Sequence, residues 1–319
     1  MRLVPGSLAG RHEYFFTPFR RDCQGSAIGC MLGIVRISIG SFNVFGIEES
    51  HDVPGFLDLA FGHLPPASAD LLGIGFQEVW FQSQLSALLD RLLAGPRETR
   101  AFTRVTAHQA AGSAYKCLVP ELPAAGIPGI RRLELSSGLV LCVKGTVRDA
   151  FFTRFRGGFT PDSFSNKGVL SAFVQSSLGS YALLTTHFHD YSNDALGGAR
   201  RNNIQALASV VRWIDDNWRA PIVLVGDFNI DSRLAHQPQP SVETVLYREL
   251  IKVRRPAGAF WFDVNARVNA PTPVITQNGG THAIDHHLLS QSAGTSGHRF
   301  ETFVAGSDHR LVKSSWDTP

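Results

Sequence analysis

The sequence predicts an α/β (α+β) protein in which two packed β-sheets are flanked by helices. Three observations carry this prediction. Short apolar or β-branched runs recur along the chain, segments between them repeat apolar residues at helical spacing, and polar residues follow many of the runs. Two packed sheets would collect such strand ends along one edge, where polar side chains can form a site.

The strands are predicted from apolar or β-branched runs that end at small or polar residues. The first of them ends at Gly40, and the last lie close to the C-terminus. We predict strands over residues 34–39, 71–76, 139–143, 168–175, 181–186, 222–225, 283–289 and 299–304, and a buried strand at Phe260–Phe262.

Helices are predicted where apolar residues recur three or four positions apart. Leucines from Leu85 to Leu93 follow this pattern, and Gly95-Pro96 ends that helix. The apolar stripe from Ile204 to Trp218 predicts the longest helix, and Pro221 follows its end. A weaker pattern indicates a helix over residues 55–64.

The composition is that of a globular protein with a large core. Of the 319 residues 44% are hydrophobic and 18% are charged, and the formal net charge is +3. The basic residues come in scattered pairs, which solvated surface explains, rather than in the stripes typical of nucleic-acid-binding proteins. We expect an N-terminal extension over residues 1–33, either a regulatory arm or a consequence of start-site choice, and a single catalytic domain over residues 34–319.

The chain shows neither a membrane-spanning segment nor a secretion signal. No apolar stretch reaches the roughly 18 residues that a span needs, and Gly29, Gly33 and Arg36 interrupt the run 27–39. These features predict a protein of the cytoplasm or the membrane periphery, with export only by another route. The four cysteines lack CxxC or metal-type spacing, so no disulfide framework is expected, although one bridge stays open. Cys142 is expected to be a small buried thiol.

Polar side chains stand at the ends of the predicted strands. Each one alone is adequately explained as a turn residue or a helix cap. The whole series, in order along the chain, favours a site. Its members are Asn43, Gln77-Glu78, His187, Asp227, Asn229, Asp285 and Asp308-His309.

The order of these motifs resembles that of the endonuclease/exonuclease/phosphatase superfamily over roughly residues 34–315. This group includes deoxyribonuclease I, apurinic endonucleases, inositol polyphosphate phosphatases and neutral sphingomyelinases. The resemblance implies a four-layer α/β/β/α sandwich of two mostly antiparallel sheets, with the active site at the edge of both sheets. The matching motifs are Phe42-Asn43, Phe76-Gln77-Glu78, Thr186-His187, Gly226-Asp227-Phe228-Asn229, Ile284-Asp285-His286 and Ser307-Asp308-His309.

The resemblance also implies a metal site for phosphoester hydrolysis. Mg²⁺ prefers oxygen ligands and keeps several waters, so few protein carboxylates suffice. Glu78 would hold the ion, assisted by the side-chain oxygen of Asn43, and Mn²⁺ or Co²⁺ could replace Mg²⁺. Asp308 would support His309 or reach the metal region.

The remaining roles follow the same pattern. His309 would take a proton from water, and Asp285 would orient and stabilise its ring. Asp227 would help to position the attacking water. Asn229 and His187 would donate hydrogen bonds to the phosphoryl oxygens.

One segment indicates a branch of the superfamily. Asp162 precedes Lys167 by five residues, and Lys167 begins a predicted strand, which is similar to neutral sphingomyelinases. Arg200 and Gln205 match the spacing of an Arg and a Gln in those enzymes. Lys167 would place a cation against the phosphate of a choline phospholipid, and the reaction would convert sphingomyelin to ceramide and phosphocholine. A turn residue followed by an ordinary strand start is the alternative explanation of the pair.

A phospholipid substrate implies peripheral contact with a membrane. Residues 151–159 interleave phenylalanines with arginines, which predicts either a docking loop or a loop packed in the core. His189, His286 and His287 are expected to be structural or adjacent to the site.

Three other functions fit the sequence less well. An inositol polyphosphate phosphatase would need basic clusters, for which Lys116, Arg131 and Arg132 are thin support. A DNA endonuclease would show basic stripes, so nucleic acid is the less favoured partner. A catalytically silent binding module would be expected to have lost one of the key residues, and Glu78 and His309 are present with the others.

Overall fold

The computed structural model describes residues 35–44, 52–65, 68–93, 95–121, 137–157, 166–190, 194–236, 241–253, 261–290, 293 and 296–318. The predicted boundary between residues 33 and 34 lies outside these ranges, as do Asp162, Phe159 and Phe260. The boundary therefore stays a prediction.

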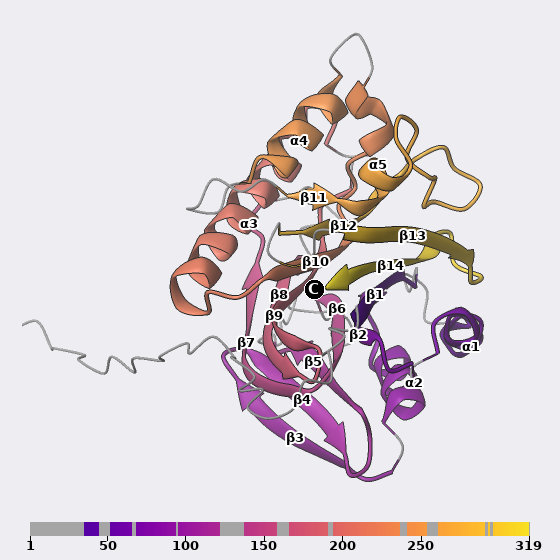
Figure 1. Ribbon diagram of the computed structural model, residues 1–319, viewed down its shortest axis with the longest axis vertical. Coiled ribbons are helices and arrows are strands. Elements are labelled where there is room, and N and C mark those ends of the chain that lie inside the picture. The colour runs from indigo at the N-terminus through magenta and orange to yellow at the C-terminus, as the bar shows by residue number, and fades with distance from the viewer. Residues whose placement is uncertain are drawn as a thin grey trace, which may run out of the picture. The chain divides into compact units, whose positions relative to one another are not determined.

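Within the described residues, eight strands form the first sheet (Figure 1). Their order is β13-β14-β1-β2-β6-β5-β4-β3. β1 and β2 are parallel, and the other neighbours are antiparallel. The strands are β1 (Val35–Asn43), β2 (Leu71–Val79), β3 (Arg97–Phe102), β4 (Val105–Ala110), β5 (Tyr115–Pro120), β6 (Gly138–Lys144), β13 (Ser296–Val304) and β14 (Arg310–Thr318).

The second sheet has the order β11-β12-β10-β9-β8-β7 among the described residues. β9 and β10 are parallel, and their neighbours are antiparallel. The strands are β7 (Thr146–Arg154), β8 (Gly168–Ser176), β9 (Gly179–His187), β10 (Ile222–Asp227), β11 (Phe262–Asp263) and β12 (Asp285–Leu289).

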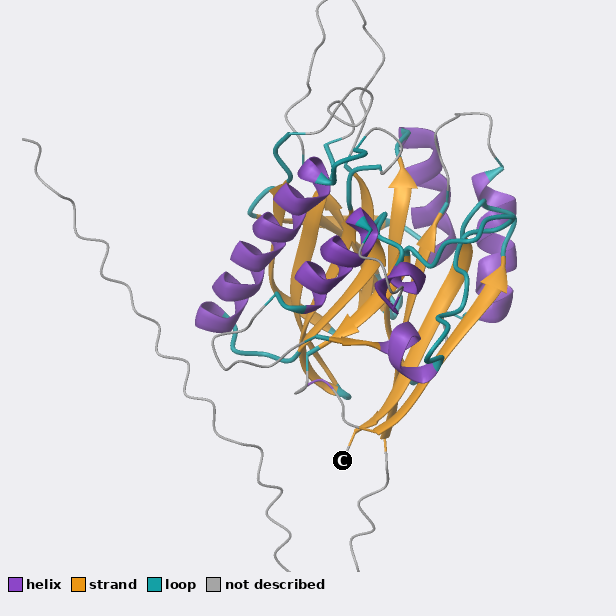
Figure 2. Cartoon of the chain, turned by 90° about the horizontal axis from the view of Figure 1, so that it is seen from above, coloured by secondary structure: helices purple, strands orange, loops and turns teal. Residues whose placement is uncertain are grey.

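Helices cover the outer face of each sheet, which gives four layers (Figures 1 and 2). α1 (Val53–His63) and α2 (Gln82–Leu92) pack on the first sheet, and α3 (Gly198–Asn217) and α4 (Val242–Ile251) pack on the second. The inner faces of the two sheets share one apolar core. The predicted four-layer sandwich is confirmed. The short α5 (Val264–Val268) and the 3-10 turn Ser232–His236 complete the elements, and no described helix is long and apolar enough to cross a bilayer.

The predicted strands are present, and several run further than expected. β1 ends at Asn43, β9 at His187 and β10 at Asp227, while Glu78 lies within β2. Asn43, His187 and Asp227, which were expected just after their strands, therefore occupy the last positions of strands. A strand holds its side chains more rigidly than a loop does, so these groups have fixed positions.

Residues 151–157 differ from the predicted loop. Phe151 and Phe152 belong to β7, and Phe152 and Phe155 are 5% and 4% exposed. Apolar side chains at these positions are core residues, so they do not form a membrane-docking loop. A register shift between Val147 and Asp149 breaks the alternation of β7, which explains why the strand was missed.

The cysteine prediction is corrected in one respect. Cys117 on β5 lies directly opposite Cys142 on β6, and a disulfide joins them in the structure. Both side chains are buried. The pairing was not visible in the sequence because β5 itself was not predicted.

Candidate active site

The topology brings the predicted polar residues to one edge of both sheets. In each sheet two neighbouring parallel strands end together, so Asn43 lies beside Gln77 and Asp227 beside His187. β12 begins where β10 ends, which pairs Asp285 with Asp227. A hydrogen bond of 2.8 Å from Gln77 Nε2 to Thr185 Oγ1 joins the two sheets.

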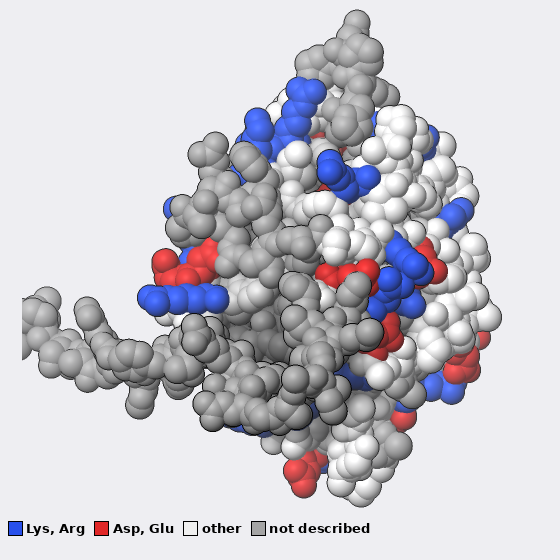
Figure 3. Space-filling view, viewed as in Figure 1, with Lys and Arg blue, Asp and Glu red and all other residues white. Residues whose placement is uncertain are grey.

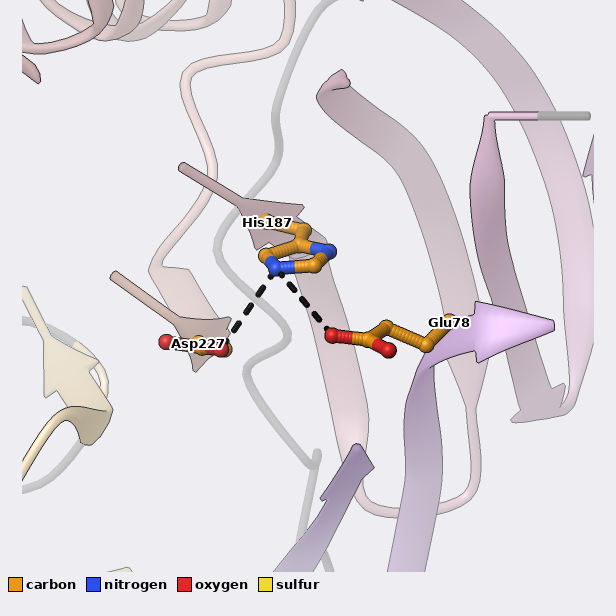
Figure 4. A group of neighbouring side chains, drawn as sticks. All are labelled: Glu78, His187 and Asp227. Carbon is orange, nitrogen blue, oxygen red and sulfur yellow. Dashed lines mark ion pairs between the residues drawn. The ribbon is translucent and has the colours of Figure 1, made fainter. Parts of the chain in front are cut away.

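Glu78, Asn43, Asp227 and His187 meet at this edge. Asn43 Nδ2 donates to Glu78 Oε1 at 3.0 Å and to Asp227 Oδ2 at 3.1 Å. His187 Nε2 lies 3.7 Å from the same Glu78 oxygen and 3.5 Å from Asp227 Oδ2 (Figure 4). The amide nitrogen of Asn43 thus donates to both carboxylates, and the predicted assistance of its oxygen to a metal stays a prediction.

His309 and Asp285 form a buried pair beside this cluster. His309 Nδ1 lies 2.9 Å from Asp285 Oδ2 and 3.2 Å from Oδ1. The other ring nitrogen, Nε2, lies 3.8 Å from Asp227 Oδ2. Nε2 is therefore the nitrogen that faces the acid cluster, and Asp285 fixes the orientation of the ring.

The loop after β10 holds Asn229 in a strained position. Asp227 Oδ1 accepts a hydrogen bond from the Asn229 N–H at 2.8 Å, and Asn229 has φ +49°. Arg200, which is buried on α3, donates to the Asn229 carbonyl at 2.7 Å and binds Asp194 and Glu243. Contacts from outside the site therefore hold Asn229 in this strained conformation.

Gly226 permits this local backbone geometry. It has φ +146°, and a Cβ at this position would lie 2.1 Å from the carbonyl oxygen of Thr186. No larger residue fits between the two parallel strands here. The glycine of the Gly-Asp-Phe-Asn motif thus allows Asp227 to reach the edge next to His187.

Lys167 lies close to Asn229 through a shared acceptor. Lys167 Nζ donates to the Phe188 carbonyl at 3.0 Å, and Asn229 Nδ2 donates to the same oxygen at 3.2 Å. Lys167 is buried. Its predicted partner Asp162 lies outside the described residues.

Asp308 is half-buried and lies close enough to the acid cluster for its charge to raise the pKa of Glu78 and of His309. Its Oδ1 accepts a hydrogen bond from Ser307 Oγ at 3.3 Å. In the part of the chain that the structure describes, two groups of side chains could hold a metal ion, and Asp308 belongs to neither. Both predicted roles of Asp308, support of His309 and contact with the metal region, stay predictions.

Three other histidines take no part in the cluster. His286 contacts Asp263 at 3.0 Å and the Ile230 carbonyl at 2.7 Å. His189 contacts Asn203, and His287 is buried against Phe300.

Two residues without a predicted role, Ser307 and Asn278, hold the segment before β14. Ser307 Oγ donates to the Asn43 carbonyl at 2.7 Å and accepts from the His309 N–H at 3.1 Å. Asn278 Nδ2 donates to the Ser307 carbonyl at 2.6 Å. Ser307 was visible as part of the Ser-Asp-His motif, whereas Asn278 carried no sequence signal.

Burial shifts the pKa values of the cluster. It raises the pKa of Glu78 and raises that of Asp227 to about 7, and it lowers that of His187 well below 6.5. Burial also opposes the charged form of His309. Three nearby carboxylates outweigh this effect of burial and raise the pKa of His309 to about 10, namely those of Asp285, Asp227 and Asp308. The carboxylates of the site therefore carry more negative charge than the side chains around them readily stabilise.

The residues fit a divalent cation. Within the described residues, the groups Glu78–His187–Asp227 and Asp227–Asp285–His309 each bring potential ligand atoms within 4.8 Å of one another. Glu78 Oε2 is buried and has no hydrogen-bond partner among the described residues. A cation next to Glu78 and Asp227 would satisfy that oxygen and favour the ionised carboxylates. It would also lower the pKa of His309 and leave Nε2 able to accept a proton.

Comparisons with known proteins agree on the fold. No protein-family model and no curated protein sequence matches the chain. Among solved structures, a mutant of Staphylococcus aureus beta toxin with bound magnesium ions is similar, with 13% identity, a TM-score of 0.54, and coverage of 88% of this chain and 99% of that chain. Sphingomyelinase C from Streptomyces griseocarneus shows 14% identity, a TM-score of 0.53 and coverage of 88% and 99%.

Truncated TDP2 from Caenorhabditis elegans is similar to the same extent, with 14% identity, a TM-score of 0.55, and coverage of 89% of this chain and 98% of that chain. Such identities define a fold and do not by themselves define an activity. The comparisons therefore show the fold, a deoxyribonuclease I-like sandwich, as the sequence predicted.

Proposed function

We propose that this chain is a divalent-metal-dependent phosphodiester hydrolase in which His309 activates water. The observation that carries this proposal is the convergence of buried acids, amide donors and the His309–Asp285 pair at one edge of both sheets. A phosphodiester is anionic, so its hydrolysis needs neutralisation of charge, an activated nucleophile and donors to the phosphoryl oxygens. The site offers a candidate for each task.

The mechanism follows from the positions of the side chains. Nε2 of His309 would accept the proton of water, because Nδ1 is occupied by Asp285. Asp227 lies on the side of Nε2 and would orient that water. His187 and Asn229 would donate to the phosphoryl oxygens. Glu78, assisted by Asn43, would hold Mg²⁺, or alternatively Mn²⁺ or Co²⁺, which supplies neutralisation of the phosphate and of the leaving oxygen when bound.

The proposed substrate is a choline phospholipid diester such as sphingomyelin. Lys167 supports this choice, because its ammonium group lies beside Asn229 and could contact the phosphate. Two of the similar solved structures are a sphingomyelinase C and a beta toxin. On the face seen in Figure 3, basic and acidic side chains are interspersed, which gives no support to a nucleic-acid track there.

The test is release of phosphocholine from sphingomyelin in mixed micelles, with Mg²⁺ and with EDTA, beside plasmid DNA and an inositol polyphosphate. We expect metal-dependent release of phosphocholine and no turnover of the other two substrates. Cleavage of DNA or release of inorganic phosphate would replace the substrate but keep the hydrolase. No turnover of any of the three would count against the proposed activity.

Two variants make this test specific to the site. His309→Gln should lower kcat by about 10²–10⁴-fold, because it removes the proton acceptor. His108→Gln is the matched control, since His108 lies on β4 away from the site, and it should leave turnover unchanged. Equal activity of His309→Gln and wild type would remove His309 from the mechanism.

A further inference from the structure

Glu78, the proposed metal ligand, has a strained backbone. Its φ is +62°, a conformation that is uncommon for residues other than glycine. The pairing of β2 with β6 shifts register between Phe76 and Val79, so Glu78 lies in an irregular stretch of its strand. Such a conformation persists only where the surrounding structure holds it in place. The contacts made directly after this stretch therefore help to decide where the Glu78 carboxylate lies.

Trp80 follows Glu78 by two residues and is held at its backbone by α2. The Trp80 N–H donates to the side-chain oxygen of Gln84 at 3.0 Å, and the Phe81 N–H donates to the same oxygen at 3.1 Å. Gln84 is buried in the first turn of α2, and Trp80 is only 6% exposed. The start of α2 thus anchors the chain immediately after the irregular stretch of β2.

Gly138 provides the space that the ring of Trp80 occupies. It is the first residue of β6, pairs with Val79 and has φ +68°. A Cβ at this position would lie 2.7–2.8 Å from three atoms of the six-membered ring of Trp80, which is closer than a side chain can approach. The indole therefore packs directly on the backbone of β6, and an alanine here would displace it.

Trp80 also contacts His187 of the second sheet. The centroids of the two rings lie 6.1 Å apart, and the ring planes are tilted by 38°. Within the described residues, Nδ1 of His187 has no hydrogen-bond partner, unlike Nδ1 of His309. Nε2 of His187 lies 3.5 Å from Asp227 and 3.7 Å from Glu78, which is longer than a normal hydrogen bond (Figure 4). Packing, with Trp80 as one of the contacts, therefore orients this imidazole.

We propose that Trp80 is a positioning residue that sets the spacing between the Glu78 carboxylate and the His187 ring, and that Gly138 supplies the space for its indole. This role rests on the proposed function, in which Glu78 holds the metal ion and His187 donates to the phosphoryl group. The two residues belong to different sheets, so their spacing depends on side chains that contact both parts of the site. Indole suits this task because it is large, rigid and has only two rotatable bonds.

A tryptophan that only fills the core would have a different effect when replaced. Its loss would lower the Tm, but the protein that stays folded would keep its affinity for Mg²⁺. The loss of a residue that positions a metal ligand costs about 10–100-fold in metal affinity or activity. Measurements on folded variants therefore separate the two roles.

Binding of Mg²⁺ to the full chain, measured by calorimetry without substrate, tests the proposal. Trp80→Leu should bind Mg²⁺ about tenfold more weakly than wild type, and Trp80→Phe, which keeps a ring, should recover part of the loss. Trp261→Leu is the matched control, because Trp261 is 7% exposed and precedes β11, which pairs with the end of β12 opposite Asp285. This control should lose stability but bind Mg²⁺ as wild type does.

Gly138→Ala tests the space for the indole. It should weaken Mg²⁺ binding about as much as Trp80→Leu does. Added to Trp80→Leu, it should change the affinity by less than about twofold, because the smaller side chain leaves room for the methyl group. Gly112→Ala is the control for the backbone, since Gly112 has φ +80° and nothing within 4 Å of its Cβ position, and it should bind Mg²⁺ normally. Losses that multiply in the double variant would remove Gly138 from this role.

Turnover at saturating Mg²⁺ tests the effect on His187 separately from that on Glu78. Because the imidazole is also displaced, kcat of Trp80→Leu on a water-soluble choline diester should stay about tenfold below wild type with the metal site filled. KM should change less. Unchanged Mg²⁺ affinity and kcat in folded Trp80→Leu, or equal losses in Trp261→Leu, would overturn the role of Trp80. If Trp80→Leu does not fold, Trp80→Phe decides in its place by the same outcomes.

The binding measurement also distinguishes failure of this role from failure of the proposed function. Wild type that binds Mg²⁺ but hydrolyses no diester would count against the proposed function. The role of Trp80 toward the metal site would then still be supported by weaker Mg²⁺ binding in Trp80→Leu. Wild type that does not bind Mg²⁺ would overturn both.

Discussion

At the scale of single residues, Asp285 controls the tautomer and the protonation of His309. The two side chains meet at 2.9 Å in a buried site, and Asp285 is the strongest of the three acids that raise the pKa of His309. An aspartate in this position fixes the tautomer with Nε2 free and stabilises the ring after it accepts a proton. Asp285 is therefore a positioning residue that acts through His309.

Asp285→Asn tests this role. The amide keeps the shape of the side chain but not its charge, so we expect kcat on the phosphodiester to fall by about 10²–10⁴-fold with little change in KM. In metal-free protein the pKa of His309, measured by NMR of the ring, should fall from its value in wild type. A variant with a normal ring pKa and normal turnover would contradict the assignment.

The members of the site could be predicted from the sequence, but the contacts that hold them could not. Asn43, Glu78 and His309 stand in recognisable motifs at strand ends, so their types and order indicate a shared edge. Ser307 Oγ binds the carbonyl of Asn43 across 264 residues of chain. A contact of a side chain with a distant backbone group leaves no pattern, because any residue type presents that carbonyl.

At the scale of elements, prediction worked where apolar residues repeat clearly at strand or helix spacing, and it missed the exposed β3 as well as the largely buried β5 and β14. The stripe on α3 and the runs in β9 and β10 are apolar because they pack in the core. β3 is an exposed edge strand with the sequence RETRAF, so its pairing with β4 has no apolar signature. Edge strands are stabilised by ladder hydrogen bonds that their own side chains do not encode.

Asp263 joins three elements behind the site. Its carboxylate caps α5 at Ala266, accepts the Tyr247 hydroxyl of α4 at 2.7 Å and contacts His286 of β12 at 3.0 Å. Burial opposes both charges, but the contact between them lowers the pKa of Asp263 and raises that of His286. Removing one partner of a buried pair leaves an uncompensated charge.

Asp263→Asn should reduce the free energy of unfolding by about 3 kcal/mol at pH 5 to 6. Because the pKa of Asp263 is lower in the folded protein than its unfolded value of 3.8, the ionised carboxylate stabilises the fold above pH 3.8. This stabilisation is lost as the pH falls through the pKa of folded Asp263. Because the pKa of His286 is higher in the folded protein than its unfolded value of 6.5, the protonated ring stabilises the fold below pH 6.5. This stabilisation is lost as the pH rises through the pKa of folded His286. Stability should therefore vary less with pH in the variant.

Urea unfolding across this pH range measures the effect of Asp263→Asn. Glu249→Gln is the matched control, because Glu249 pairs with Arg201 at the surface, where both side chains are 39–40% exposed. Such a pair contributes only about 0.2–1 kcal/mol. Similar losses in the two variants at all pH values would show that the buried pair has no special part in stability.

At the scale of the whole molecule, the two sheets are the reason that residues far apart in the chain share one site. Glu78 comes from the first sheet, and Asp227 from the second. The packing of the sheets brings the two carboxylates to the same Asn43 nitrogen. Like charges buried together oppose folding, so this arrangement is stable only to the extent that something offsets their charge.

The last prediction is that adding Mg²⁺ reverses the order of stability of wild type and Glu78→Gln. Burial raises the pKa of Glu78 above 4.5, so at neutral pH the ionised side chain opposes folding. Glu78→Gln should therefore have a Tm equal to or above that of wild type in EDTA. With Mg²⁺ at about 100 times its Kd, wild type should gain about 2.7 kcal/mol, or roughly 5 °C, whereas Glu78→Gln should gain little. Glu301→Gln, at an exposed position, should respond to Mg²⁺ as wild type does. If Mg²⁺ raised the Tm of wild type and Glu78→Gln equally, the ion would bind elsewhere and Glu78 would not be its ligand.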